Sequence, residues 1–258
     1  MPKIELIQGD CLELMKEIPD KSIDMILCDL PYGTTQNKWD SVIPFEPLWS
    51  HYWRVLKPNG AVVLTAAQPF TSVLVTSQLD RFKYQWVWEK SKVTGVLNAK
   101  KQPLRNHEDV LVFYRQQPTY NPQGVVPCSI RANTGRSSSG KSSGNYGAIT
   151  QTEDGTYEQT QTGYPRSVLK VASEGKTVHP TQKPVALFEY LIKTYTNEGD
   201  LVLDNVAGSF TTAIASENLK RNWICIEREA EYCEIGRKRI EENRERLRML
   251  DNCAKLDI

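Results

Sequence analysis

Short apolar runs alternate with segments of helical periodicity along most of the 258-residue chain. The run Ile23–Cys28 (IDMILC) is almost continuously apolar, which predicts a strand buried on both faces. Phe82–Trp88 and Val110–Tyr114 are rich in aromatic and β-branched residues, which favours strands. The whole pattern predicts seven strands: Ile4–Gln8, Ile23–Cys28, Ala61–Thr65, Phe82–Trp88, Val110–Tyr114, Leu201–Leu203 and Trp223–Ile226.

Helical segments lie between most of these strands, and a turn is expected at Lys57–Gly60. The expected helices are Cys11–Ile18, Glu46–Leu56, Pro69–Gln78, Pro184–Thr194, Ser209–Asn218 and a highly charged final helix, Glu229–Leu247. Strands that alternate with helices indicate an α/β sheet covered on both faces. Because β-α-β crossovers are right-handed in nearly all proteins, we expect a Rossmann-like sheet.

The pattern changes in residues 116–178, which are rich in Gly, Ser, Thr, Asn and Gln and contain the run RSSSGKSSGNYG. This stretch is too long for a connecting loop of a compact domain. It is therefore either a disordered linker or an insertion that orders on a partner. We interpret it as an insertion into one α/β domain, whose halves are residues 1–115 and 179–258. The alternative is a two-domain protein in which the segment folds separately.

Composition excludes several classes of protein. The chain is 40% hydrophobic and 24% charged, which is typical of an ordinary globular protein. It has no apolar run of transmembrane length and no signal-like N-terminus, so neither a membrane nor a secretory location is expected. Its six cysteines form no C-x-x-C pair and it has three histidines, which argues against a metal site. We expect a cytoplasmic protein.

The net charge of +1 hides a basic segment. Residues 81–115 carry eight Lys or Arg and three Asp or Glu, whereas residues 1–80 carry six and ten. A basic stretch in a neutral protein suggests a polyanionic partner, although a solvated surface is the alternative. The candidate contacts are Lys90, Lys92, Lys100, Lys101 and Arg105, together with Arg131, Arg136 and Lys141 of the insertion.

Acidic residues follow four of the predicted strands. The tetrapeptide Asp29-Leu30-Pro31-Tyr32 comes after Ile23–Cys28, Gly9-Asp10 follows the first strand, and Asp204 and Glu227 end two late strands. Ligands of open α/β sheets bind beyond the carboxyl ends of strands, which makes each of these a candidate site residue. Taken singly, each is also compatible with an ordinary turn or helix cap.

Two further segments add candidate chemistry. The glycine turn 204–212, DNVAGSFTT, leads into a helix, and such a turn aims backbone N–H groups at a ligand. Glu227 follows Asp204 at close to the ~20-residue spacing at which an acid accepts ribose hydroxyls. The rigid segment His179–Pro184, HPTQKP, precedes a helix and says little alone.

Together, the D-x-P-Y tetrapeptide, the HPTQKP segment and the D-x-x-x-G-S-x-T-T loop resemble the amino-methyltransferases of DNA that use S-adenosylmethionine. Their order along the chain resembles the β group of that family, and the resemblance covers nearly the whole chain except residues 116–178. It implies a circularly permuted Rossmann-like methyltransferase sheet in which 116–178 recognises the target. It also implies adenine-N6 methylation of double-stranded DNA, often by a homodimer and within a restriction-modification system.

The resemblance assigns roles to individual residues. Asp29 and the Leu30 carbonyl would accept the hydrogens of the target amine, Pro31 would stiffen the turn, and Tyr32 would stack on the flipped base. For S-adenosylmethionine, Asp10 and Cys11 would meet the adenine end, and Glu227 would meet the ribose. The methionine end would meet Asp204, Gly208 and Ser209, and the cofactor carboxylate would meet Thr181 and Lys183 from the other side.

The sequence departs from the family pattern at a few positions. Leu30 replaces a proline, and in the glycine loop Asn205, Val206 and Phe210 replace Pro, Phe and a second Gly. Phe210 would narrow the cofactor pocket or demand an unusual backbone angle. One alternative is therefore a DNA-binding descendant with weakened catalysis. The choice of acceptor leaves two more, which are cytosine-N4 methylation and an RNA or protein acceptor.

Overall fold

The computed structural model describes residues 4–33, 40–133, 156–175 and 182–256. The chain divides into two compact units. The main unit comprises Met1–Asn121 and Ser167–Ile258, and the second unit comprises Pro122–Arg166. In the described part of the second unit, β6 (Val126–Asn133) and β7 (Thr156–Thr162) form an antiparallel ribbon.

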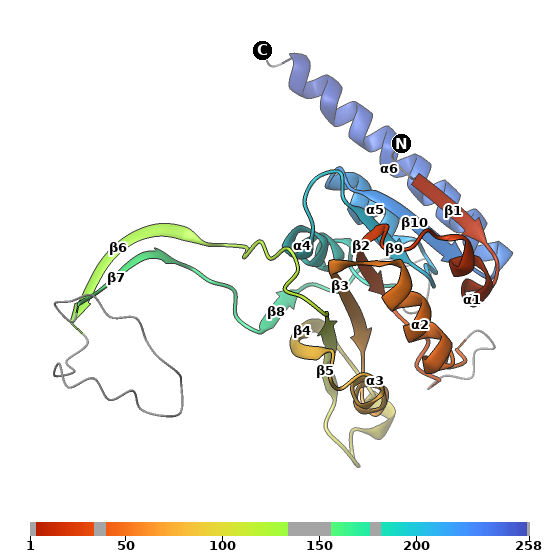
Figure 1. Ribbon diagram of the computed structural model, residues 1–258, viewed down its shortest axis with the longest axis horizontal. Coiled ribbons are helices and arrows are strands. Elements are labelled where there is room, and N and C mark those ends of the chain that lie inside the picture. Colours follow the sequence, from red (N-terminus) through yellow and green to blue (C-terminus); the bar gives the residue numbers. More distant parts are fainter. Residues whose placement is uncertain (1–3, 34–39, 134–155, 176–181, 257–258) are drawn as a thin grey trace. The chain divides into compact units, whose positions relative to one another are not determined.

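Eight strands of the described chain form one sheet in the main unit, in the order β1-β10-β9-β2-β3-β5-β4-β8 (Figure 1). Their bounds are β1 Ile4–Gln8, β2 Ile23–Cys28, β3 Leu56–Ala66, β4 Phe82–Thr94, β5 Arg105–Phe113, β8 Val168–Val171, β9 Leu201–Asp204 and β10 Asn222–Glu227. The strands from β1 to β3 in this order are parallel, and β5 runs antiparallel to both its neighbours. This confirms the predicted Rossmann-like α/β sheet.

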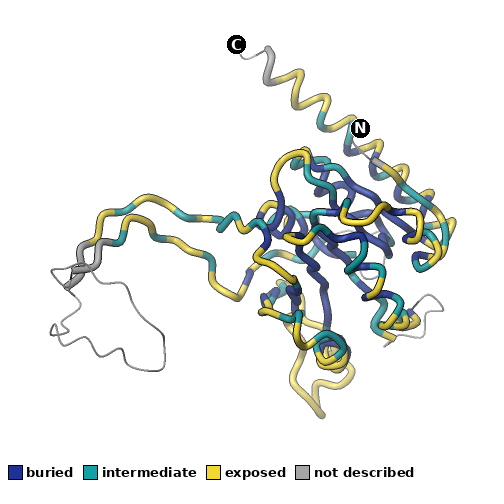
Figure 2. Tube along the Cα trace, viewed as in Figure 1, coloured by how far each residue is buried: buried dark blue, intermediate teal, exposed yellow. Residues whose placement is uncertain are grey.

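Helices cover both faces because alternate side chains of the buried strands point to opposite sides. Ile26 and Cys28 join a core cluster with α1 and α2, whereas Met25 and Leu27 join another with α4. Figure 2 shows these strands as a buried layer between the helices. The helices are α1 Cys11–Leu14, α2 Phe45–Val55, α3 Phe70–Ser77, α4 Val185–Tyr195, α5 Thr211–Asn218 and α6 Ala230–Leu256.

Some predicted bounds are wrong. The sheet has one strand more than expected, since β8 lies within residues 116–178 yet pairs in parallel with β4 of the main unit. The predicted turn Lys57–Gly60 is a bulge inside β3, where Ile23 pairs with Leu56 but Met25 pairs with Ala61. The first predicted helix ends early at Leu14 and continues as a short 3-10 turn, Met15–Glu17.

The strand order joins distant parts of the sequence at the centre of the sheet. β9 pairs with β2, so the glycine turn after β9 lies beside the D-x-P-Y tetrapeptide after β2. The circular permutation implied by the resemblance stays an interpretation of this order. Within the described ranges, no helix combines the length and apolar character needed to cross a bilayer, and no group of three His, Cys, Asp or Glu could hold a metal ion.

Candidate active site

Four predicted acids lie at one edge of the sheet. Asp10, Asp29, Asp204 and Glu227 follow or end the adjacent parallel strands β1, β2, β9 and β10, so they meet where the carboxyl ends meet. All four line a cavity of about 680 Å³ in the main unit. That volume lies within the roughly 300–1,000 Å³ of small-molecule sites. The structure therefore brings together the segments that the sequence singled out separately.

The Asp29 carboxylate is held by three side-chain donors. The Tyr32 hydroxyl donates to Oδ1 over 2.8 Å, and the Thr65 hydroxyl donates to the same oxygen. The Lys183 ammonium donates to Oδ2 over 2.7 Å. A carboxylate has about four acceptor positions, two on each oxygen. These donors fill Oδ1 and take one position on Oδ2, so Oδ2 keeps an acceptor position at the cavity wall.

Lys183 is buried between two carboxylates. Its side chain is 7% exposed, and its Nζ also lies 3.2 Å from an oxygen of Glu108. Burial alone would lower the pKa of Lys183, but the charges of Asp29 and Glu108 outweigh burial and raise it. Lys183 therefore stays protonated and acts as a donor to Asp29. This contact differs from the expected one with the cofactor carboxylate.

Lys90 belongs to the same group of ion pairs and is not exposed like the other basic residues of the β4–β5 hairpin. Its side chain is 10% exposed and lies 3.0 Å from Glu108. Burial opposes ionisation of Glu108, but Lys183 and Lys90 hold its pKa below the ordinary value. Because the Lys90 ammonium is paired with Glu108 and largely buried, the structure argues against the predicted contact of Lys90 with a DNA phosphate. Sequence reasoning missed both Glu108 and Thr65. Glu108 lies in the polar first half of β5, RNHED, and Thr65 is one hydroxyl near the end of the apolar strand β3, so neither belongs to a recognisable motif.

Tyr32 is fixed from two directions. Its ring stacks on Phe70 with centroids 5.1 Å apart, and the Lys183 Nζ lies 5.7 Å from the ring centroid. Burial, followed by the charges of Asp29 and Glu108, raises the pKa of Tyr32 well above its ordinary value, so the hydroxyl remains a donor. The sequence predicted a role only for the ring of Tyr32, as a stacking surface. In the structure the Tyr32 hydroxyl also orients Asp29.

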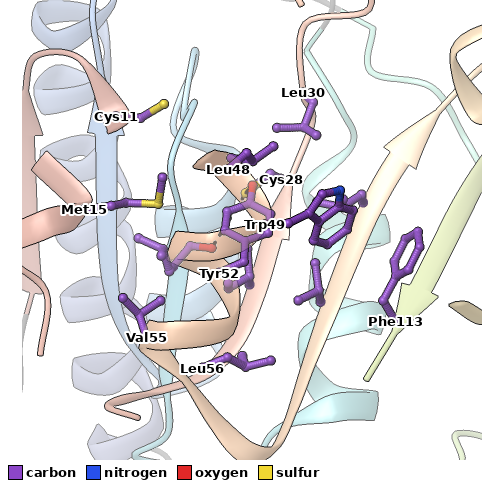
Figure 3. Close-up of a cluster of buried hydrophobic side chains, with 14 of the residues drawn as sticks. Cys11, Met15, Cys28, Leu30, Leu48, Trp49, Tyr52, Val55, Leu56 and Phe113 are labelled. Atoms are coloured by element: carbon purple, nitrogen blue, oxygen red, sulfur yellow. Dashed lines mark hydrogen bonds between the residues drawn. The ribbon is translucent and has the colours of Figure 1, made fainter. Parts of the chain in front are cut away.

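Leu30 anchors the tetrapeptide to the core. Its side chain is buried in the cluster that contains Leu48 and Trp49, where Figure 3 shows it. Leucine packs well in this apolar cluster, so the replacement of the family's proline by Leu30 leaves the tetrapeptide at the cavity. Leu30 and Pro31 both line the cavity, between Asp29 and Tyr32.

Asp204 and Glu227 hold the glycine turn by accepting hydrogen bonds from its backbone. Asp204 is buried and accepts hydrogen bonds from the Thr212 hydroxyl (2.5 Å) and the Val206 N–H (3.1 Å). Burial raises the pKa of Asp204 to about 7, against these hydrogen bonds, which lower it. Glu227 accepts the N–H groups of Gly208 and Glu229, each over 2.8 Å. Both carboxylates thus shape the loop while lining the cavity.

The remaining predicted cofactor residues have distinct positions. Asp10 accepts the Leu12 N–H over 2.8 Å and so caps α1, which also places Cys11 at the cavity. Gly208 and Ser209 line the cavity too, whereas Thr181 lies outside the described residues. Phe210 is fully buried in a separate cluster with Ala213 and Trp223. Its ring therefore does not narrow the cavity.

The other predicted DNA contacts fall in three places. Lys92, Lys100, Lys101 and Arg105 are exposed on the hairpin of β4 and β5. Arg131 lies in β6 of the second unit. Arg136 and Lys141 lie outside the described residues.

The sequence that forms this acid-lined cavity matches the model of a known family. A family model described as DNA methylase, covering N6 and N4 amino-methyltransferases, matches residues 23–238. The chain therefore belongs to this family of DNA methyltransferases.

Individual relatives agree over nearly the whole chain. The DNA adenine methyltransferase YhdJ of Escherichia coli (strain K12) is 30% identical over 92% of this chain and 82% of its own length. The type II methyltransferase M2.DpnII of Streptococcus pneumoniae is 26% identical over 94% and 91%. The crystal structure of the M1.HpyAVI–SAM complex, at 26% identity, covers 92% of this chain and 99% of its own with a TM-score of 0.61.

Proposed function

We propose that this protein is a DNA adenine-N6 methyltransferase that uses S-adenosylmethionine and acts on an adenine rotated out of the duplex. The observation that carries the proposal is the Asp29 carboxylate, which three donors fix at the cavity wall with one acceptor position of Oδ2 left. A carboxylate in that state suits a target that brings a hydrogen-bond donor. The exocyclic amine of adenine is such a target, and YhdJ, a relative named a DNA adenine methyltransferase, supports this choice of base.

The residues around the cavity fit S-adenosylmethionine by their chemistry. The cofactor carries ribose hydroxyls, an amino group and a cationic sulfonium, and each of these suits a carboxylate. Glu227 uses one acceptor position of each oxygen within the protein, which leaves positions for ribose hydroxyls. Asp10 and Cys11 remain the proposed contacts of the adenine end, and Asp204, Gly208 and Ser209 those of the methionine end. When bound, the cofactor supplies an electrophilic methyl group on sulfur.

The catalytic residues act on the target amine. Conjugation with the ring withdraws the nitrogen lone pair, so the free amine is a poor nucleophile. Asp29 Oδ2 accepts one N6 hydrogen and the Leu30 carbonyl accepts the other, which favours a tetrahedral nitrogen with a lone pair aimed at the methyl group. Transfer from the bound cofactor would replace its carbon–sulfur bond by a nitrogen–carbon bond, and Asp29 or water would accept the proton that the acidic aminium nitrogen releases. Positioning and fixed dipoles, rather than a strong base, provide the rate.

The partner is duplex DNA, reached through the exposed basic residues Lys92, Lys100, Lys101 and Arg105. Cationic side chains on one hairpin suit phosphate contacts, which position a protein without reading sequence. Residues 116–178, with Arg131 among them, are proposed to contact phosphates as well, and a few of their side chains are proposed to read base edges. The homodimer, the cytoplasmic location and the prokaryotic or phage origin stay predictions. YhdJ and M2.DpnII both come from bacteria, which agrees with that origin.

Methyl transfer with a labelled cofactor tests the proposal. The protein is incubated with unmethylated genomic DNA and S-adenosylmethionine labelled in the methyl group, and the DNA is digested to nucleosides. We expect label in N6-methyldeoxyadenosine, with loss of nearly all transfer in Asp29→Ala and retained binding of S-adenosylhomocysteine. Label in N4-methyldeoxycytidine would overturn the choice of base. Transfer by Asp29→Ala at the wild-type rate would overturn the mechanism.

A further inference from the structure

The end of the β4–β5 hairpin, residues 91–107, is exposed at every position and is here named the hairpin tip. It is an ordered turn, because the N–H of Asn98 donates to the Gly95 carbonyl, and the N–H groups of Lys101 and Gln102 both donate to the Asn98 carbonyl. A short 3-10 turn, Val96–Asn98, forms its end. Figure 2 draws this hairpin end as exposed.

Apolar side chains stand at the end of the hairpin tip. Leu97 is 100% exposed and Val96 is 65% exposed, and Val93 and Leu104 are exposed as well. A single exposed leucine is ordinary, but four exposed apolar side chains gathered in one hairpin end point to a partner that covers them.

The charges of the hairpin tip indicate the nature of that partner. Lys92, Lys100, Lys101 and Arg105 lie within residues 91–107, and this stretch of sequence contains no Asp or Glu. Exposed apolar side chains with cationic residues on both sides suit a partner whose surface is anionic and whose interior is apolar. A DNA duplex has this character, with phosphates outside and stacked bases inside.

The hairpin tip also continues the wall of the catalytic cavity. Trp88, Lys90, Lys92 and Thr94 alternate along β4, so they share one face of the strand, and all four line the cavity. β4 ends at Thr94, and after one residue, Gly95, the 3-10 turn Val96–Asn98 begins. An apolar point therefore stands next to the place that the target base must enter.

We infer that Val96 and Leu97 insert into the duplex beside the target base and fill the gap that the base leaves when it rotates into the cavity. Apolar wedges of this kind unstack neighbouring bases, and the flanking lysines and arginine hold the backbone on either side. The inference rests on the proposed function, since it requires a base that leaves the stack. It adds a role for two residues that contact neither the cofactor nor the reacting amine.

Methylation of two matched duplexes tests the inference, once modified-base sequencing of DNA treated with the wild type has located the methylated site. In one duplex the target adenine is paired, and in the other it lies opposite an abasic residue, which removes most of the unpairing cost. We expect Leu97→Ala to slow single-turnover methylation of the paired duplex by about tenfold or more, and of the abasic duplex by less than about threefold. Leu79→Ala, at a leucine that is 65% exposed elsewhere, is the matched control and should leave both rates unchanged.

The double variant Lys100→Ala plus Lys101→Ala separates insertion from attraction to phosphate. It should weaken both duplexes equally and reduce the salt dependence of binding. Equal losses on both duplexes for Leu97→Ala, or no loss at all, would overturn insertion. A change in oligomeric state of Leu97→Ala in sedimentation would also overturn it and assign the hairpin tip to a subunit interface. If the wild type transfers no methyl group to any DNA, the proposed function itself fails. If the wild type is active and Leu97→Ala is equally active on both duplexes, only the insertion fails.

Discussion

The ring of Phe210 fills the space that Gly236 leaves on α6. A Cβ atom built on Gly236 would overlap the ring carbons of Phe210. Phe210 has φ 62° and ψ 33°, a left-handed conformation that favours glycine, and it is fully buried at the start of α5. The glycine that the family pattern expects at this position is thus replaced by a pair, in which a strained phenylalanine packs against a glycine on another helix.

This pair predicts a substitution effect whose sign depends on the partner. Gly236→Ala should lower the free energy of unfolding by about 1–3 kcal/mol, because the added methyl overpacks the ring. In a Phe210→Ala background, the same change should instead stabilise by up to about 1 kcal/mol, because alanine favours the helix interior. Urea unfolding of the four proteins measures both effects. Additive changes would show that the two side chains do not share the space.

Lys183→Met should impair turnover rather than cofactor binding. The change removes the donor to Asp29 Oδ2 and leaves Asp29 and Glu108 facing each other without the buried cation between them. We expect kcat to fall by roughly ten- to a hundredfold, which corresponds to about 1.5–3 kcal/mol for a hydrogen bond to a charged group. The Kd for S-adenosylhomocysteine, measured by calorimetry, should change by less than about threefold.

Lys92→Met is the matched control for that prediction, since Lys92 is an exposed lysine of the same cavity rim. It should keep kcat and weaken DNA binding modestly. If Lys183→Met instead lost cofactor affinity at unchanged kcat, Lys183 would be a ligand of the cofactor carboxylate, as the family resemblance implies.

Asp204 predicts a pH dependence of stability. Burial raises its pKa to about 7 from 3.8, so between about pH 4 and 7 the folded protein holds a proton that the unfolded chain has released. The unfolded state then binds fewer protons, and stability falls as pH rises through this window and levels off above about pH 7. The contribution has an upper bound of about 4 kcal/mol, since one pKa unit corresponds to about 1.4 kcal/mol.

Asp204→Asn isolates this contribution from the other titrating groups. Urea unfolding at pH 5 and pH 8 should show a smaller loss of stability in the variant than in the wild type. An equal loss in both proteins would mean that Asp204 does not keep its proton in the folded state at pH 5.

The sequence could predict the sheet and its acidic edge because both depend on local patterns. Continuous apolar runs identify parallel strands, and an acid after such a run lies at the carboxyl end wherever the strand pairs, as Asp29 and Asp204 show. The position of β8 could not be predicted, since Val168–Val171 is short, lies in a polar stretch and becomes a strand through its pairing with β4.

The contacts around Asp29 could not be predicted for a similar reason. Lys183, Glu108 and Lys90 come from distant parts of the chain, and their ion pairs form only after α4, β5 and β4 assemble. The orientation of Phe210 likewise depends on Gly236, 26 positions further along the chain. Sequence patterns therefore identified several residues that line the cavity, such as Asp29 and Asp204, whereas the folded arrangement was needed to find Glu108 and to assign the partners.

Tyr32 provides the last prediction, because its ring and its hydroxyl have separate contacts. Tyr32→Phe keeps the ring on Phe70 but removes the donor to Asp29 Oδ1, where Thr65 remains. We expect kcat to fall by about tenfold, the lower end for a hydrogen bond to a charged group, with cofactor affinity unchanged. Tyr32→Ala should cost roughly tenfold more, because a ring that stacks on a base contributes about 1–3 kcal/mol.

Tyr84→Phe is the control for the loss of a tyrosine hydroxyl, since the Tyr84 hydroxyl contacts Tyr195 in the other core cluster and lines no part of the cavity. Its kcat should match the wild type. Single-turnover methylation of one DNA substrate by all three variants makes the comparison, with the cofactor Kd measured on the same samples. A Tyr32→Phe protein with the wild-type rate would show that Thr65 and Lys183 alone orient Asp29, and it would leave base stacking as the function of Tyr32. A Tyr32→Phe protein as slow as Tyr32→Ala would show the opposite, that the ring matters chiefly as the carrier of the hydroxyl.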